Sequence, residues 1–242
     1  MMTLEEKIFE YVKSQSDMEA CGFIENNIFY PAPNMAANPK ETFFIAPNNY
    51  RPQAKILVHS HPNNEPFLSG ADRLSQAQTG LDFWLVTQGK IKKFRHCPLL
   101  KGRVFEYGKY DCGAIIEDAY MLMGIFQEQV VRNELHTDEK RSILPTNLLK
   151  RGFHQIANQH DGISAIQAGD VVLTSMQGVA NHAGFYLGDG KILHHPLNGL
   201  SRVETFGGYW IRGFHSIWRH PDVKPFMLEA VFNDLNAGID HD

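Results

Sequence analysis

The sequence predicts a mixed α+β fold, because stretches of helical periodicity alternate with short runs of β-branched and aromatic residues. Residues 3–16 have apolar side chains at helical spacing, and residues 69–79 read as a polar helix that follows several short strands. Residues 112–123 repeat the helical spacing, and residues 169–194 contain a turn, a strand and a hairpin signal. We therefore expect helices and strands in both halves of the chain.

A change of composition near residues 97–103 indicates a boundary between two domains. We place the first domain at residues 1–98 and the second at residues 104–242. The order helix, sheet, helix in the first half is typical of an α/β layer in which helices flank one mixed sheet. The length of 242 residues also allows one large domain, so the boundary depends on this change of composition.

The first predicted helix is amphipathic. Leu4, Ile8 and Val12 recur at helical spacing, and glutamates and lysines face away from them. Thr3 and Glu6 have the spacing of a capping box, in which each side chain bonds the backbone N–H of the other residue. The pattern indicates a surface helix with one apolar face.

Short apolar runs bounded by turn residues predict the strands of the first domain. The expected strands are residues 21–24, 28–30, 42–45, 55–58 and 82–87. Asn26 and Asn27 form a turn between the first two strands, and residues 31–39 form a loop rich in proline, asparagine and alanine. Residues 48–51 are expected as a turn or a short helix.

His59 and His61 follow the fourth of these strands, and side chains two positions apart on an extended segment point to the same side. Asp72 lies in the first turn of the helix that starts at Ser69, so its carboxylate can swing back to the histidines. Two neutral imidazoles, one carboxylate and an open fourth position are the ligands that a catalytic zinc ion needs. The alternative is a chance histidine pair in a loop beside an ordinary capping box.

The His-Ser-His-Pro motif at residues 59–62, followed after six residues by Ser69-x-x-Asp72, resembles the signature of JAMM (MPN-type) zinc metallopeptidases. Glu19, just before a Cys-Gly pair, fits the position of the catalytic glutamate of that family. The resemblance covers about the first hundred residues and implies an amide or isopeptide bond as substrate. It also implies that Glu19 takes a proton from water and that Ser69 bonds the developing oxyanion.

Composition excludes several classes of protein. A net charge of −4 provides no basic surface for nucleic acid and no polybasic membrane patch. No apolar run approaches the roughly 20 residues that cross a bilayer, and the N-terminus has no signal-peptide pattern. Three cysteines (Cys21, Cys97 and Cys112) cannot all pair, which argues against a disulfide framework. We therefore expect a protein that is made in a reducing cytosol, or one that leaves the cell by a route that needs no signal.

A second candidate site begins at Cys112. Apolar residues at helical spacing follow it as far as Met123, with Asp111 as a good N-cap and Gly124 as a good residue after the helix. Cys112 then lies in the first helical turn, where the macrodipole favours a thiolate. The alternative is that Cys112 is a small buried hydrophobic residue.

A catalytic thiol needs a histidine base, and the base needs a third group on its other ring nitrogen. His182 and His194 lie on the two arms of a hairpin built on Gly-Asp-Gly at residues 188–190. With a three-residue loop, His194 pairs with Gly184 and the two histidines share a face; with a two-residue loop they face opposite sides. The site therefore requires the odd loop or an equivalent bulge. His195 then points away and is structural or solvated.

These residues resemble those of the NlpC-type cysteine peptidases, a papain-like family that mostly cleaves the peptide stems of bacterial cell wall. Cys112 at a helix start matches the nucleophile, residues 181–188 match the strand of the base, and His194 matches the third polar position. The resemblance covers about residues 104–220 and implies a papain-like α+β domain in which His182 is the base. The alternative is a binding module that has the cysteine and the histidines by accident.

The end of the chain carries fewer signals. The apolar and aromatic residues at 206–210 and 216–220 are expected to close the edge of the second sheet, and the alternative is that they form a wall that binds peptide. Residues 225–235 predict a final helix, and the Asp-His-Asp tail at residues 240–242 is expected to be solvated.

A JAMM-like domain followed directly by an NlpC-like domain resembles the tail tip assembly proteins of lambda-like siphophages, and residues 206–210 also fit that family. The resemblance implies a protein made in the host cytoplasm that acts at the virion tail tip. Its implied partners are other phage tail tip proteins, its implied cofactor is zinc, and its implied substrate is the peptidoglycan stem peptide at the host cell wall or periplasm. Neither nucleic acid nor a membrane-spanning segment is expected.

Two other functions remain open from the sequence. The chain can be a structural tail tip component whose peptidase folds serve mainly as surfaces that bind partners. It can also be a cellular peptidase that trims an isopeptide-linked protein. The full set of expected active-site residues in both domains favours the peptidase over the purely structural role. The NlpC-like half argues against a cellular isopeptidase, because the usual target of that family is the cell wall.

Overall fold

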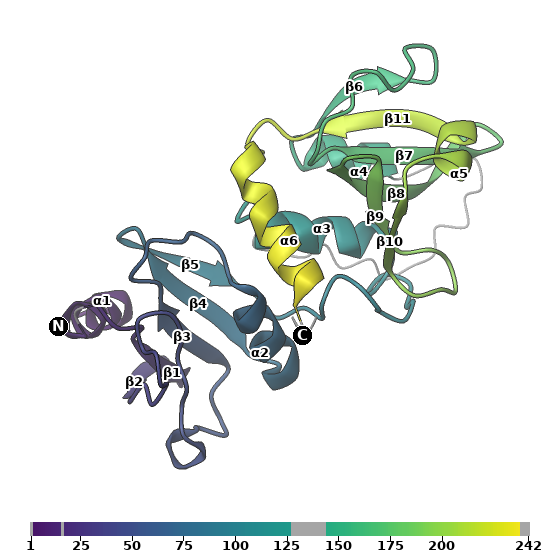
Figure 1. Cartoon of the computed structure of the whole chain (residues 1–242). Helices are drawn as coiled ribbons and strands as arrows, with labels where there is room; N and C mark the ends of the chain where they lie inside the picture. Colours follow the sequence, from purple (N-terminus) through teal and green to yellow (C-terminus); the bar gives the residue numbers. More distant parts are fainter. Residues whose placement is uncertain (1, 16, 127–143, 238–242) are drawn as a thin grey trace. The chain divides into compact units, whose positions relative to one another are not determined.

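The computed structural model describes residues 2–15, 17–126 and 144–237. They divide into two compact units, one formed by the residues up to Pro98 and the other by Leu99–Asn236 (Figure 1). None of the helices in these ranges has the length and apolar character that crossing a bilayer requires. The Asp-His-Asp tail lies outside the described residues.

The first unit is built on a five-stranded mixed sheet with the strand order β2-β1-β3-β4-β5. The strands are β1 Cys21–Glu25, β2 Ile28–Ala32, β3 Ile56–Ser60, β4 Asp82–Thr87 and β5 Lys90–Phe94. Strands β3 and β4 are parallel and are joined through helix α2 (Gly70–Thr79), as a parallel pair requires a crossover, and the other neighbours are antiparallel. The central strand β3 leads directly into the histidine motif.

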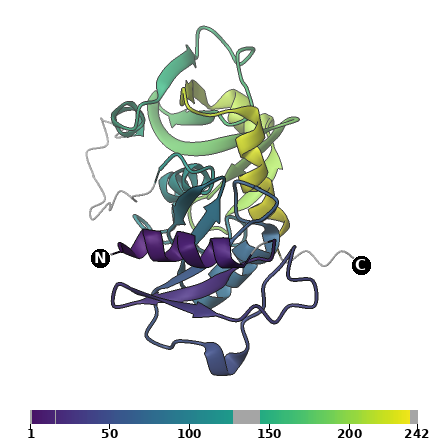
Figure 2. The ribbon, with the colours of Figure 1, turned by 90° about the vertical axis from the view of Figure 1, so that its left-hand side faces the viewer.

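Helix α1 (Leu4–Ser14) covers one face of this sheet, and Figures 1 and 2 show it lying across the strands. Its fully buried Ile8 packs against Ile24, Val58 and Val86, one residue from each of three neighbouring strands. Burying a side chain of this size stabilises the fold by about 1.5–3 kcal/mol. Thr3 forms the expected capping box, so the prediction for this helix is confirmed.

The expected strand at residues 42–45 is wrong, because this segment is irregular in the structure. The side chain of Asn34 accounts for the difference: its amide nitrogen donates to the carbonyl of Thr42 and its amide oxygen accepts from the backbone of Phe44. The backbone groups that a sheet ladder would satisfy are thus bonded within a long loop. The short helix expected nearby is present as a 3₁₀ turn, η1 (Pro47–Asn49).

The second unit is built on a six-stranded antiparallel sheet with the order β10-β9-β8-β7-β11-β6. The strands are β6 His154–Asn158, β7 Val171–Met176, β8 Val179–Gly188, β9 Lys191–His194, β10 Arg202–Thr205 and β11 Phe214–Arg219. Its described helices are α3 Cys112–Leu122, α4 Leu144–Lys150, α5 Gly208–Arg212 and α6 Leu228–Asn236, the last preceded by the 3₁₀ turn η2 (Pro225–Met227).

Opposite faces of this sheet are covered by different helices. Helix α3 packs against β8 and β9, where the ring of Tyr120 contacts that of Phe185 at 5.7 Å between centroids. On the other face Trp210 of α5 is buried against Val172 and Ile192. Residues 206–210 therefore cover a face of the sheet rather than its edge, which corrects that expectation, and β11 lies inside the sheet between β7 and β6.

Candidate functional site

The hairpin of β8 and β9 has a two-residue turn together with a β-bulge. Asp189 and Gly190 form the turn with positive φ angles of 48° and 67°. The register shifts between Tyr186 and Gly188, and His194 consequently pairs with Gly184. The two candidate histidines share a face only because of this shift, as the sequence argument required, and the bulge is the form that the structure uses.

The rings of His182 and His194 are hydrogen-bonded, with 2.9 Å between His182 Nε2 and His194 Nδ1. The indole of Trp210 packs on both rings, at centroid distances of 5.4 and 5.2 Å. Gly184 lies beside these rings, and a larger residue would not fit there, since a Cβ at this position would approach the Trp210 ring to 2.5 Å. The glycine therefore lets the indole hold the histidine pair against the sheet.

Glu204 extends this pair. Its Oε2 lies 3.2 Å from Nε2 of His194, while Trp210 Nε1–H donates to its Oε1 at 2.9 Å. Arg202 Nε–H donates to Oε2 at 3.1 Å. Sequence reasoning did not select Glu204; the signal that identifies it is the pairing of β10 with β9, which puts Glu204 opposite Ile192 and diagonally next to His194.

Burial determines the protonation of the two rings. It lowers the pKa of His182 to about 4, and neighbouring His194 acts in the same direction against the charge of Glu204. Burial likewise lowers the pKa of His194, with Glu204 opposing it. At neutral pH His182 is therefore an uncharged imidazole, the form that can accept a proton.

Cys112 is the first residue of α3, as predicted. The carboxylate of Asp111 caps the helix and accepts from the backbone N–H groups of Gly113 and Ala114 at 3.0 and 2.9 Å. A third bond comes from the backbone of Gly108 at 2.8 Å. The half-buried thiol thus starts at a fixed helix N-terminus, where the helix dipole favours negative charge.

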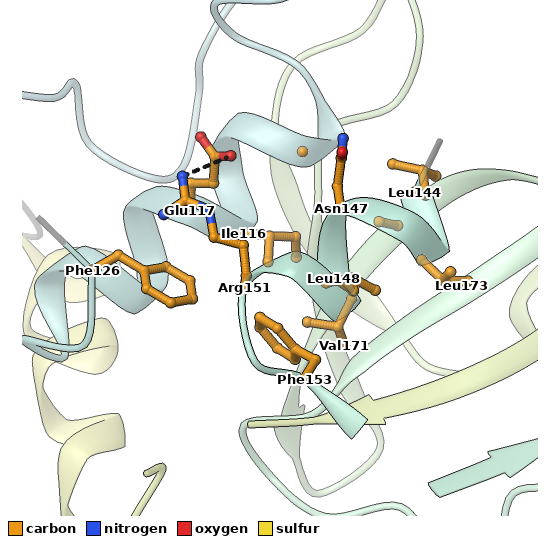
Figure 3. A pocket seen from close by; sticks show the side chains of 12 residues that line it. Ile116, Glu117, Phe126, Leu144, Asn147, Leu148, Arg151, Phe153, Val171 and Leu173 are labelled. Carbon is orange, nitrogen blue, oxygen red and sulfur yellow. Dashed lines mark hydrogen bonds and ion pairs between the residues drawn. The ribbon is translucent and has the colours of Figure 1, made fainter. Parts of the chain in front are cut away.

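A mostly apolar pocket lies where α3 and α4 meet strands β7 and β8 (Figure 3). Gly113 and Ala183, which directly follow Cys112 and His182 in the chain, both line it. The start of α3 therefore lies close to the strand that carries His182. Figure 3 also shows the ion pair between Glu117 and Arg151, 3.5 Å apart, among its lining residues.

The first unit brings the other candidate residues together. Nε2 of His59 lies 3.3 Å from one carboxylate oxygen of Asp72, and Nε2 of His61 lies 3.2 Å from the other. All three side chains are buried, and one nitrogen or oxygen atom from each lies within 4.8 Å of the others. The loop-back of Asp72 to the two histidines is as the sequence predicted.

Ser69 orients the carboxylate of this cluster. Its hydroxyl donates to Asp72 Oδ2 at 2.7 Å and its backbone N–H donates to the same oxygen at 2.8 Å. The backbone N–H of Asp72 in turn donates to Ser69 Oγ at 3.1 Å, which completes a capping box. The capping box and the histidine cluster therefore coexist, and the same aspartate belongs to both.

The cluster has the donor chemistry of a zinc site. Both ring nitrogens of His59 are buried and make no well-formed hydrogen bond: Nε2 has only its 3.3 Å contact with Asp72, although an unsatisfied buried polar group is costly. A cation between two imidazole nitrogens and a carboxylate oxygen would satisfy one of them. Two nitrogen ligands and one oxygen ligand suit Zn²⁺, so these residues fit the ion.

Glu19 lies next to this cluster. Cys21 pairs with His59, and the hydrogen bond from Ser60 N–H to the carbonyl of Ala20 continues the same register toward Glu19 and His61. Glu19 is only 6% exposed, and burial raises its pKa to about 7. Its carboxyl group can therefore exchange a proton near neutral pH.

Comparison with known proteins defines the class of the second unit. Residues 102–219 match the model of the NlpC/P60 family, so this unit is an NlpC/P60 peptidase-like domain. The match contains Cys112, His182, His194 and Glu204. It begins after the histidine cluster of the first unit.

Two phage proteins resemble the chain over most of its length. Tail tip assembly protein K of Escherichia phage lambda is 41% identical over 182 residues, which cover 75% of this chain and 89% of that protein. Tail tip assembly protein K of Escherichia phage N15 is 27% identical over 238 residues, covering 90% and 94%. The chain belongs to the tail tip assembly protein K family.

Similar solved structures include the NlpC/P60 domain of the peptidoglycan hydrolase SagA. It is 14% identical, with a TM-score of 0.31, and the match covers 63% of this chain and 99% of that one. An NlpC/P60 family protein from Bacillus cereus is 11% identical with a TM-score of 0.32, covering 88% and 66%.

Proposed function

We propose that this protein is a tail tip assembly protein whose second unit is a cysteine peptidase that cleaves peptidoglycan stem peptides. The observation that carries the proposal is the hydrogen-bonded pair of His182 on β8 and His194 on β9, the two strands against which α3 packs. The protein is made in the host cytoplasm and acts at the virion tail tip, during tail assembly or when the host wall is opened. Its partners are other tail tip proteins.

In this site Cys112 is the nucleophile and His182 the base. The thiolate of Cys112 attacks the carbonyl carbon of a stem peptide bond, and His182 passes the thiol proton to the leaving amine. Water then hydrolyses the thioester and returns the proton to sulfur. His194 orients His182 through their 2.9 Å hydrogen bond.

The alternation of side chains along β8 restricts how the thiol reaches the base. Ala183 faces the pocket beneath α3, so its neighbour His182 points to the opposite face, toward Trp210. The flank of α3 packs on the Ala183 side. The thiol of Cys112 must therefore reach the ring of His182 from the first turn of α3, not from the flank of the helix. For this reason the mutational test is aimed at these two residues.

Digestion of purified peptidoglycan, with mass analysis of the products, tests this function. The wild-type protein should release stem-peptide fragments, and both Cys112→Ala and His182→Ala should release none. His59→Ala/His61→Ala, which alters the other unit, is the matched control and should leave these products unchanged. No products from reduced wild-type protein would support the structural tail tip role, in which the peptidase folds bind partners.

The first unit supports a second activity, a zinc-dependent (iso)peptidase of the JAMM type, because one ligand atom each of His59, His61 and Asp72 converges in a buried cluster. These residues would hold the ion, which supplies a Lewis acid for the amide carbonyl and for water. Glu19, whose pKa burial raises to about 7, would accept the proton that water loses. Ser69 would bond the oxyanion, but its hydroxyl now donates to Asp72 and must first be released.

Metal analysis tests the zinc site of this second activity, separately from the peptidoglycan assay. After zinc incubation and gel filtration, the wild-type protein should retain about one zinc ion per chain. His59→Ala and Asp72→Ala should retain none, and His160→Ala, at an exposed histidine of the other unit, should retain as much as wild type. Equal retention by all four proteins would contradict the assignment of the ligands.

A further inference from the structure

The carboxylate of Glu204 is fixed from two sides. Trp210 donates its indole N–H to one oxygen, and Arg202 donates to the other. Hydrogen bonds and the neighbouring cation favour the ionised form, and together with His194 they lower the pKa of Glu204 although burial acts in the opposite direction. An ionised carboxylate can only accept hydrogen bonds.

That acceptor faces His194. The 3.2 Å contact of His194 Nε2 with Glu204 Oε2 is not a well-aligned hydrogen bond, and it is an ion pair only when His194 is protonated, so on the neutral ring it acts through the charge of the carboxylate. The negative oxygen attracts a proton on Nε2 of His194, whereas it repels a lone pair on that nitrogen. Neutral His194 therefore carries its proton on Nε2 and leaves Nδ1 as an acceptor.

The tautomer of His194 determines that of His182. Because His194 Nδ1 accepts, the 2.9 Å hydrogen bond between the rings must use a proton on His182 Nε2. Neutral His182 then has no proton on Nδ1, which is the only nitrogen left to act as a base. The reversed arrangement would place a proton on Nδ1 and disable the ring as a proton acceptor.

We propose that Glu204 is a positioning residue of the cysteine peptidase site: through His194 it selects the tautomer in which His182 presents an unprotonated Nδ1 to the thiol. The proposal rests on the proposed peptidase function and deepens it by a fourth member, which touches neither substrate nor thiol. Trp210 has two roles in this arrangement, since its indole packs on both histidine rings and its N–H orients Glu204.

Glu204→Gln tests the proposal sharply, because it changes only one oxygen to an NH₂ group. Trp210 is buried and donates to Oε1, whereas Arg202, whose side chain is 52% exposed, can turn away from Oε2. The glutamine oxygen should therefore remain at Trp210, and its amide nitrogen should face His194. A donor at that place reverses both tautomers. With a synthetic stem peptide we expect kcat to fall by about 100-fold, as for loss of a general base, while KM changes less than about twofold.

Nitrogen NMR of ¹⁵N-histidine-labelled full-length protein identifies the tautomers of the two rings and needs no activity assay. His182→Gln and His194→Gln assign the two rings. Wild type should show both rings protonated on Nε2, and Glu204→Gln should show both protonated on Nδ1. Glu204→Asp, which keeps the charge, should restore the wild-type tautomers. The matched control Arg202→Gln, which removes the neighbouring cation and leaves the carboxylate, should also keep them.

Two outcomes overturn the proposal. One is an Nδ1 proton on His182 in the wild-type protein, a result that needs no variant to fold. The other is a folded Glu204→Gln protein whose tautomers and kcat match wild type. If the wild-type protein shows the expected tautomers and loses them in Glu204→Gln but cleaves no peptide, the peptidase function fails, and the control of the two histidine tautomers by Glu204 stands.

Discussion

His182 and His194 are hydrogen-bonded at 2.9 Å because a single bulge between Tyr186 and Gly188 shifts the register of their hairpin. Without it, a two-residue turn would place the rings on opposite faces of the sheet. The local irregularity of β8 is thus a condition for the candidate site, in line with the frequent occurrence of bulges beside active sites.

Gly184→Ala should destabilise the second unit. The added methyl group would lie 2.5 Å from the ring of Trp210 and 2.7 Å from Ile192, so these two side chains must move, and overpacking of this kind costs about 1–3 kcal/mol. Urea unfolding measures the change. Gly207→Ala is the matched control, because its methyl group would meet nothing closer than 3.9 Å, and it should have little effect. Equal effects of the two substitutions would contradict this packing.

Asp111→Ala should weaken the start of α3. Three backbone N–H groups lose their acceptor, and loss of an N-cap costs about 1 kcal/mol, with more expected here because Asp111 is buried. Asp111→Asn keeps an acceptor oxygen and should recover most of the free energy of unfolding. An alanine variant as stable as wild type would show that the cap contributes little.

His182 should remain neutral down to a pH near its pKa of about 4, and NMR titration of its ring measures this. Between the ordinary value of 6.5 and about 4, the unfolded state binds more protons at this residue than the folded state. Its contribution to the free energy of unfolding is therefore present above pH 6.5 and is lost as pH falls toward 4. His182→Gln should lose less stability than wild type over that range, and an identical loss would contradict the shifted pKa.

Ser69→Ala should affect both stability and metal binding in the first unit. It removes a cap, at about 1 kcal/mol, and frees the carboxylate of Asp72, which should weaken zinc binding by about 10-fold or more. Thr3→Ala removes the equivalent capping box of α1, which has no part in the cluster. It should cost similar stability and leave zinc affinity unchanged, as titration calorimetry would show; equal zinc affinities of both variants and wild type would refute the role of Ser69.

The features that sequence predicted well depend on local chemistry. Asp111 as N-cap, the capping box at Thr3, and the shared face of His59 and His61 each follow from residues a few positions apart. Such patterns carry their own physical reason and need no knowledge of distant parts of the chain.

The features that sequence missed depend on distant pairing. Glu204 joins the site only because β10 pairs with β9, and nothing near Glu204 in the chain indicates its partner. The expected strand at residues 42–45 failed because Asn34 bonds its backbone from outside the segment. Strand β5 was not expected, since three of its five residues are lysines, and it forms by pairing with the buried β4. Tertiary context overrides local propensity at each of these places.

The most direct test of the central claim is covalent capture of the nucleophile. A stem peptide with a chloromethyl ketone in place of its scissile bond is incubated with the full-length protein, and intact-mass and peptide mapping locate the adduct. We expect one adduct on Cys112, none on the buried Cys21 and Cys97, and a rate at least about 10-fold lower in His182→Gln. Modification of Cys112 at the same rate in wild type and His182→Gln, or no modification of Cys112, would contradict the assignment of a thiol and its histidine base.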